Sequence, residues 1–96
     1  MTQFSSRSLI KRREQIVLKE MEVEKEGILL NLKNGHYFVA NELGLFIWKL
    51  LDGKKNLEQI AGRIVFRYKG TKTAVLADLI VFVKGLYKRK LVMIVE

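Results

Sequence analysis

The side chains in this sequence that could do chemistry are one histidine and three closely spaced glutamates. His36 has no Ser or Cys partner pattern around it. Glu20, Glu22 and Glu24 alternate along a segment expected to be a strand, and a carboxylate ladder of this kind could bind a cation. We expect the simpler alternatives, an exposed histidine in a strand beside a turn and a solvated strand face.

The residues that are absent exclude several kinds of chemistry. The chain has no Cys, which excludes disulfides, thiolate catalysis and cysteine-based zinc sites. A single His excludes histidine-cluster metal sites, and the seven Gly residues are scattered without forming a phosphate-binding loop. We therefore expect a protein that is not an enzyme and holds no metal and no cofactor.

The elements that position these residues begin with strands. A length of 96 residues predicts one domain. The first strand is expected within 16–24, with a bulge or a strand end where the alternation slips at Lys19–Glu20. Turn-forming residues at 25–27 then lead into an apolar strand at 28–32.

The strongest local signal is Asn34-Gly35, because both residues tolerate the positive φ angles of a two-residue type I′ turn. This turn predicts a third strand at 36–40. The product is a three-stranded antiparallel meander whose third strand lies at an open edge.

The second half predicts three helices. Asn41 is expected to cap the first, which ends at Asp52-Gly53 and is followed by a loop at Lys54-Lys55. Asn56 and Gln59 have the spacing of a capping box and begin the second helix.

A break at 69–71 separates the second helix from the third, which is expected at 73–89. The apolar, β-branched residues 91–95 then predict a short terminal strand.

The formal charge of +8 favours an acidic partner, but it is unevenly distributed. Residues 1–13 hold four basic and no acidic residues, residues 14–42 hold six acidic and three basic residues, and residues 43–96 hold 11 basic and four acidic residues. We expect 1–13 to be a flexible basic tail and 14–96 to be the folded domain. Because no apolar run is long enough to span a membrane, we expect a cytoplasmic protein with no membrane span.

The third helix has a second apolar face that includes Val75 and Phe82, next to a gap at Gly85. One core-facing stripe would be enough for such a helix. Two explanations remain open at this point. Phe82 could simply pack on the sheet, or the helix and the sheet edge could enclose a groove in which Gly85 leaves room for a ligand.

The second and third helices together resemble a helix-turn-helix, which raises DNA binding. In that case the N-terminal residues of the third helix would contact bases. Thr73, Ala74, Val75, Ala77 and Asp78 stand there, and they include no Arg, Lys, Asn or Gln to read bases. The basic residues lie at the other end of this helix, where they interact favourably with the helix dipole.

Four segments, taken in order, are similar to the PqqD-like family, the peptide-recognition domains (RiPP recognition elements) of ribosomal natural-product biosynthesis. They are Gly27-Ile28-Leu29-Leu30-Asn31-Leu32, Asn34-Gly35-His36-Tyr37-Phe38, Asn41-Glu42 and Ile47-Trp48-Lys49-Leu50-Leu51-Asp52-Gly53. The resemblance covers about residues 16–92. It implies an α+β fold, a winged helix-turn-helix with an N-terminal three-stranded antiparallel sheet followed by a three-helix bundle. One departure is Ala40, where many relatives have Leu.

The resemblance also implies a binding site. The leader segment of a precursor peptide would add as a strand to the third strand, and its side chains would enter a groove beside the third helix. By position, the implied peptide-binding residues are His36, Tyr37, Phe38, Val39, Ala40, Val75, Leu79, Phe82, Val83 and Leu86. Basic residues that could attract an acidic leader are Lys54, Lys55, Lys84, Lys88 and Arg89.

The sequence thus leads to the hypothesis of a non-catalytic protein that binds a leader peptide and presents the precursor to a separate modifying enzyme. A lasso-peptide leader peptidase is the first choice for that enzyme, and a radical SAM enzyme is the second. The alternatives are a DNA-binding winged helix-turn-helix regulator and a plain protein–protein adaptor.

Overall fold

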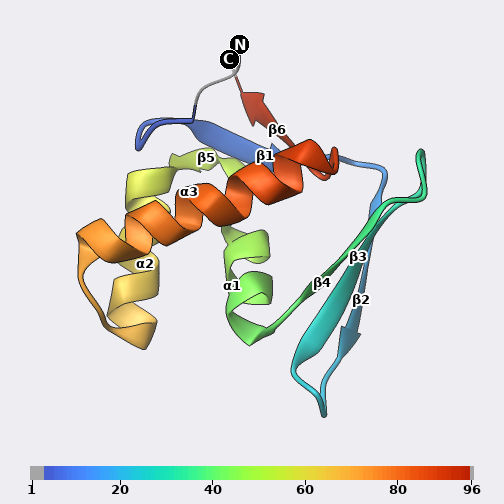
Figure 1. Cartoon of the computed structure of the whole chain (residues 1–96), viewed down its shortest axis with the longest axis horizontal. Coiled ribbons are helices and arrows are strands. Elements are labelled where there is room, and N and C mark those ends of the chain that lie inside the picture. The colour runs from blue at the N-terminus through green and yellow to red at the C-terminus, as the bar shows by residue number, and fades with distance from the viewer. Residues whose placement is uncertain (1–3, 96) are drawn as a thin grey trace.

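The computed structural model describes residues 4–95, and Figure 1 shows how they fold. Six strands and three helices make up this part of the chain. In chain order they are β1 (Leu9–Arg12), β2 (Ile16–Met21), β3 (Glu26–Asn31), β4 (Tyr37–Ala40), α1 (Glu42–Leu50), β5 (Asp52–Asn56), α2 (Leu57–Tyr68), α3 (Lys72–Lys88) and β6 (Val92–Val95). The predicted α+β class is confirmed, but the strands form two sheets where one was expected.

The first sheet has the order β5-β1-β6 and is antiparallel. Its central strand comes from the segment expected to be a flexible tail, and that expectation is wrong for residues 9–12. Ile10 is fully buried in the core. Arg12 donates from Nη1 to the carbonyls of Trp48 at 2.9 Å and Lys49 at 3.0 Å, so it caps the C-terminal end of α1. Part of the basic charge in this segment therefore has a structural role, and the folded domain begins before residue 14.

The second sheet is the predicted meander, with the order β2-β3-β4. The pairing of β2 with β3 runs without interruption from Ile16 opposite Asn31 to Met21 opposite Glu26. Of the two alternatives for Lys19–Glu20, the bulge is absent, and the strand ends just after these residues, at Met21. The turn between the two strands spans residues 22–25, earlier than predicted, and Gly27 lies inside β3.

The loop between β3 and β4 is longer than the two-residue turn predicted from Asn34-Gly35. Gly35 has φ of +77°, but Asn34 is outside the positive region, so the turn is not type I′. The N–H of Gly35 donates to the Asn31 carbonyl at 2.8 Å, and the N–H of Asn31 donates to the His36 carbonyl at 2.8 Å. Four residues, 32–35, therefore form the loop, and His36 lies just before β4.

The helix caps are where the sequence placed them. Asn41 accepts from the N–H of Gly44 at 2.8 Å and caps α1. Asn56 and Gln59 form a complete capping box at the start of α2. Thr71 caps α3, which begins one residue earlier than predicted. The predicted terminal strand is present as β6.

The segment after α1 differs from the prediction. Residues 52–56 form β5, which pairs with β1, whereas a helix end and a basic loop were expected. The sequence Asp52-Gly53-Lys54-Lys55-Asn56 lacks the apolar alternation that marks a strand. It becomes a strand because β1 supplies hydrogen-bonding partners.

The core lies between the two sheets and the three helices. It contains Ile10, Leu29, Trp48, Leu57, Ile60, Leu79, Val83, Leu86, Leu91 and other apolar residues. One buried polar side chain, Asn31, joins the meander to the end of α3: its Nδ2 donates to the Lys90 carbonyl at 2.8 Å, and its Oδ1 accepts from the N–H of Lys33 at 2.9 Å. No helix in the part of the chain that the structure describes is long and apolar enough to cross a membrane.

Candidate functional site

An open groove of about 470 Å³ lies between the edge strand β4 and helices α1 and α3. Its walls are mainly apolar. Strand β4 and the residue after it contribute Phe38, Val39, Ala40 and Asn41; α1 contributes Leu43, Gly44 and Ile47; α3 contributes Val75, Asp78, Leu79 and Phe82; and Glu26 and Ile64 complete the lining. An apolar cleft beside an unpaired strand is suited to an extended peptide.

The free edge of β4 can be derived from the pairing register. The N–H of Asn31 donates to the His36 carbonyl, and Phe38 and Ala40 stand opposite Leu29 and Gly27. Because hydrogen-bonded and non-hydrogen-bonded pairs alternate in an antiparallel ladder, Phe38 and Ala40 direct their backbone groups to β3. The N–H and C=O groups of Tyr37 and Val39 consequently point to the open side.

The same alternation sorts the side chains. Phe38 and Ala40 lie on the face that packs toward α1 and α3, with Phe38 half-buried and Ala40 buried. Tyr37 and Val39 lie on the opposite face and are 63% and 50% exposed. A strand added beside β4 would therefore place every second side chain, those opposite Phe38 and Ala40, over the groove.

One wall of the groove is an aromatic pair. The rings of Phe38 and Phe82 meet edge to face, with centroids 5.6 Å apart. This contact answers the question that the sequence left open: Phe82 does touch the sheet, and it also lines the groove. Gly85 is not part of the lining, and a Cβ there would meet only the Arg89 guanidinium at 3.7 Å, so the expected gap at Gly85 does not serve the groove.

Small residues keep the middle of the groove hollow. A Cβ on Gly44 would lie 3.1 Å from the Ala40 Cβ and 3.4 Å from Cζ of Phe82. Glycine at this position lets α1 approach β4 closely without filling the space beside Phe82. A larger side chain at either small position would reduce the volume available to a ligand.

The groove brings together six of the ten residues expected to bind the peptide: Phe38, Val39, Ala40, Val75, Leu79 and Phe82. His36 and Tyr37 are exposed and outside the lining, although Tyr37 offers backbone groups at the edge. Val83 and Leu86 are fully buried in the core. The family resemblance, carried over by position, placed the last two on the groove. The apolar spacing of α3 alone does not say which face of the helix meets the core.

Sequence reasoning missed the contribution of α1. Leu43, Gly44 and Ile47 line the groove because α1 begins two residues after β4 ends. The cap at Asn41 was a usable signal, since it places the first turn of the helix directly beside the edge strand. For Glu26 and Asp78, nothing in the sequence pattern indicated a position on the groove.

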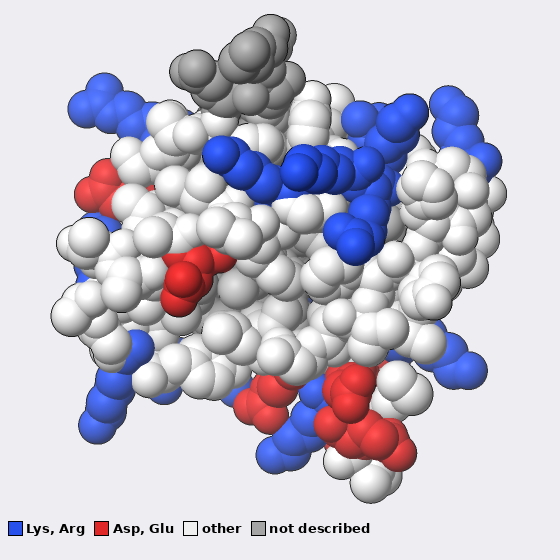
Figure 2. Space-filling view, in the orientation of Figure 1, with Lys and Arg blue, Asp and Glu red and all other residues white. Residues whose placement is uncertain are grey.

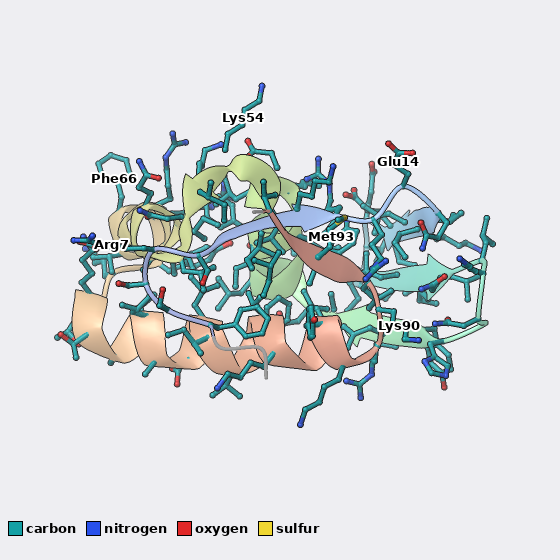
Figure 3. All side chains as sticks on the ribbon, turned by 90° about the horizontal axis from the view of Figure 1, so that it is seen from above. Arg7, Glu14, Lys54, Phe66, Lys90 and Met93 are labelled. Atoms are coloured by element: carbon teal, nitrogen blue, oxygen red, sulfur yellow. The ribbon has the colours of Figure 1, made fainter. Side chains whose placement is uncertain are left out.

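The basic residues expected to attract a leader lie in two places. Lys54 and Lys55 belong to β5 in the other sheet, and Figure 3 shows Lys54 projecting on the side opposite α3. Lys55 contacts Asp52 at 2.6 Å. This ammonium, followed by the N–H of Lys54, lowers the pKa of Asp52 to about 2. Only the cluster at the end of α3 lies on the same face of the molecule as the groove.

The C-terminal end of α3 carries this second basic group, Lys84, Lys88 and Arg89, and all three are exposed. Figure 2 shows basic side chains gathered over this end of α3, acidic side chains near the β2–β3 turn, and largely uncharged surface between them. The guanidinium carbon of Arg89 lies 5.2 Å from the centre of the Phe38 ring, and Nη1 donates to the Gly85 carbonyl at 3.2 Å. Arg89 therefore borders the groove beside Phe38.

The residues singled out for chemistry do not assemble a reactive centre in the described part of the chain. His36 is exposed, and its backbone N–H donates to the Asn34 side chain. Of the three glutamates, only Glu20 lies in β2, where it pairs with Lys49 at 2.6 Å; Glu22 and Glu24 lie in the turn. The expected strand-face ladder is thus absent. Within residues 4–95, no three acidic, His or Cys side chains form a group that could hold a metal ion.

Comparisons with known proteins agree with this geometry. A family model described as coenzyme PQQ synthesis protein D (PqqD) matches residues 26–92. The structure of TbiB1 in complex with the TbiA(beta) leader peptide is similar, with 30% sequence identity and a TM-score of 0.75 over 85% of this chain and 93% of that one. No curated protein matches the sequence.

Two further solved structures share the fold. One is the solution structure of the PqqD truncation of Methylobacterium extorquens PqqCD, described as a functional, stand-alone RiPP recognition element. Its TM-score is 0.80 at 23% identity, over 96% of each chain. The other is lasso peptide synthetase B1 complexed with the leader peptide, with a TM-score of 0.71 at 21% identity over 88% of this chain and 98% of that one.

Proposed function

The chain belongs to the PqqD family, and from this premise we propose that it is a precursor-peptide recognition protein. It binds the leader segment of a ribosomally synthesised natural product as an added strand on β4. The observation that carries the proposal is the unpaired edge of β4 beside an apolar groove. The structures of TbiB1 and lasso peptide synthetase B1, each in complex with a leader peptide, support a leader peptide as the ligand.

The expected affinity for the leader can be estimated from the backbone groups and apolar surface that would contact it. Tyr37 and Val39 provide four backbone groups, each worth about 1 kcal/mol when paired. Two or three apolar leader side chains in the groove add about 2 kcal/mol each. Ordering the leader costs about 3 kcal/mol. The balance, about 5–7 kcal/mol, corresponds to a dissociation constant of tens to hundreds of micromolar.

The role we assign is recognition and delivery without catalysis. The groove is mainly apolar, and its two carboxylates, Glu26 and Asp78, stand without a His or Cys in the lining. Chemistry on the precursor then belongs to a separate enzyme. A lasso-peptide leader peptidase is our first choice, because the relative with 30% identity carries a leader peptide and another match is a lasso peptide synthetase component. A radical SAM enzyme is the second choice.

A DNA-binding regulator is the alternative, because α2 and α3 follow one another as the helices of a winged helix-turn-helix do. The face that α3 would present to a major groove argues against it. Its N-terminal half exposes Thr73, Ala74, Ala77 and Asp78, so no Arg, Lys, Asn or Gln is available there beyond Lys72, which pairs with Glu58 at 3.3 Å. A gel shift with upstream DNA at ~0.15 M salt should show no specific complex.

The proposal is tested by sequencing the neighbouring genes and titrating the isotope-labelled protein with the N-terminal segment of a short precursor peptide if one is encoded there, and otherwise with the TbiA(beta) leader peptide. Backbone amide shifts are expected at residues 37–44 and along the groove face of α3. Phe82→Glu puts a charge into the apolar groove, and we expect at least a tenfold loss of affinity. Val81→Glu is the matched control, since Val81 is the adjacent residue on α3 and is 71% exposed. The groove is not the leader site if both variants are folded and bind the leader equally well.

A further inference from the structure

The two ends of the groove carry opposite charges. At the Phe38 end, the guanidinium of Arg89 lies over the Phe38 ring and is exposed. At the other end, the lining includes the acidic residues Glu26 and Asp78. Neither carboxylate has an ion-pair or hydrogen-bond partner among the interactions of residues 4–95, in contrast to Glu20, which is paired with Lys49.

The distance between the two charged ends of the groove can be estimated from the rise along α3. Strand β4 and α3 run in opposite directions along the groove, because Arg89, just after α3, meets Phe38 near the start of β4. Asp78 precedes Arg89 by 11 positions, which corresponds to about 16 Å along a helix. An extended peptide covers the same distance with about five residues.

The apolar part of the groove lies between these charges. Side chains of an added strand that stand opposite Phe38 and Ala40 point into it, and these two positions are separated by one residue. The intervening side chain stands opposite Val39 and lies on the outer face. The ligand therefore needs two apolar residues at positions i and i+2.

Resting on the proposed function, we propose that this groove selects peptides by the order of their charges as well as by their apolar residues. The preferred ligand has two apolar residues at i and i+2, a basic residue at the Ala40 end that meets Glu26 and Asp78, and an acidic residue at the Phe38 end that meets Arg89. The two charged residues stand at i−2 and i+4, about six positions apart, because groove-facing side chains of the added strand recur at every second position. The opposite order would place like charges together at both ends and is rejected.

An unbiased test uses an mRNA-displayed library of random decapeptides, selected on the immobilised protein. We expect enrichment of the apolar pair flanked by one basic and one acidic residue in a constant order. Selection on the double variant Glu26→Gln/Asp78→Asn should keep the apolar pair and lose the basic residue. Selection on Arg89→Gln should lose the acidic residue alone.

The affinity of the most enriched peptide gives the magnitude. Replacing its basic residue by Gln should weaken binding about two- to fivefold, the range of a solvent-accessible ion pair, and the loss should disappear in the Glu26→Gln/Asp78→Asn variant. A nitroxide attached beside the basic residue should broaden amide signals near Ala40 and Asp78. Broadening near Arg89 in its place would overturn the proposal.

The outcomes separate the inference from the function on which it rests. Charge selection is refuted if the apolar pair is enriched with no constant order of charges. It is also refuted if both variants select the same order as the parent protein. Either result leaves peptide binding intact. Enrichment of no apolar pair at all, with no amide shifts in the groove, refutes both.

Discussion

The substitution Val39→Pro tests the derived register of β4 directly. Proline has no backbone N–H, and the register directs the N–H of Val39 to the open side, where the leader would accept it. The pairing with β3 does not use this group. Proline is tolerated on an edge strand when its missing N–H would face solvent, so the variant should fold.

The size of the effect follows from the lost donor. One backbone hydrogen bond contributes about 0.5–1.5 kcal/mol, which corresponds to a two- to tenfold weaker complex. The side chain of Val39 contributes little, because it lies on the outer face and is 50% exposed. The matched control is Val39→Ala, which keeps the N–H and should change the affinity less than twofold.

The assay is fluorescence anisotropy with a labelled leader peptide, combined with urea unfolding of each variant. Hydrogen exchange supplies a second measurement: the amides of Tyr37 and Val39 should exchange rapidly in the free protein and slowly in the complex. The amides of Phe38 and Ala40 should be protected in both states. If folded Val39→Pro binds as tightly as Val39→Ala, strand addition at β4 is the wrong mode of binding.

Three further predictions concern the fold that holds the groove. Asn31→Ala removes the buried donor to the Lys90 carbonyl and should lower the free energy of unfolding by about 1–3 kcal/mol in urea. Ile10→Ala should lower it by about 2–5 kcal/mol, because Ile10 is fully buried. The pKa of Asp52 is lowered by Lys55, so its ionised form stabilises the fold above its usual value of 3.8. This contribution should disappear as the pH falls toward about 2, and Asp52→Asn should lack that part of the pH dependence.

Each of these predictions has a control nearby in the chain. Asn34→Ala removes an exposed acceptor in the same loop and should cost less than Asn31→Ala. Lys11→Ala, at an exposed position of β1, should stay within about 0.5 kcal/mol of the parent. If Ile10→Ala matched Lys11→Ala, residues 9–12 would be the loose tail that the sequence suggested. Equal pH profiles for the parent and Asp52→Asn would show that the Lys55 contact does not stabilise the fold.

Local patterns predicted the elements that depend on local interactions. The capping box at Asn56 and Gln59 was predictable, because both partners lie within one helical turn. The meander was predictable, because its strands alternate and are joined by short turns. The length of the loop around Asn34-Gly35 was not, because the buried side chain of Asn31 organises it through contacts with Lys33 and, remote in sequence, Lys90.

The sheet β5-β1-β6 could not be predicted from these patterns. Strand β5 is polar along its whole length, and β1 lies in a basic segment with a single fully buried residue. In the described part of the chain, strand β5 pairs only with β1, and β1 also pairs with β6, whose residues lie about eighty positions further along the chain. The strand propensity of a segment does not indicate a hydrogen-bonding partner that lies so far away in the sequence.

The sequence alone determined that the chain has one α+β domain, an edge strand after Asn34-Gly35, three helices of which the first two have recognisable caps, and no cysteine or histidine cluster for chemistry. These properties follow from residue types and their short-range spacing. Only the tertiary structure decided which apolar face of α3 is buried and which lines the groove, that α1 forms a wall, and that Glu26 and Asp78 oppose Arg89 along the site. The rotation of a helix about its axis is set by what packs against it, and here those partners come from distant parts of the chain.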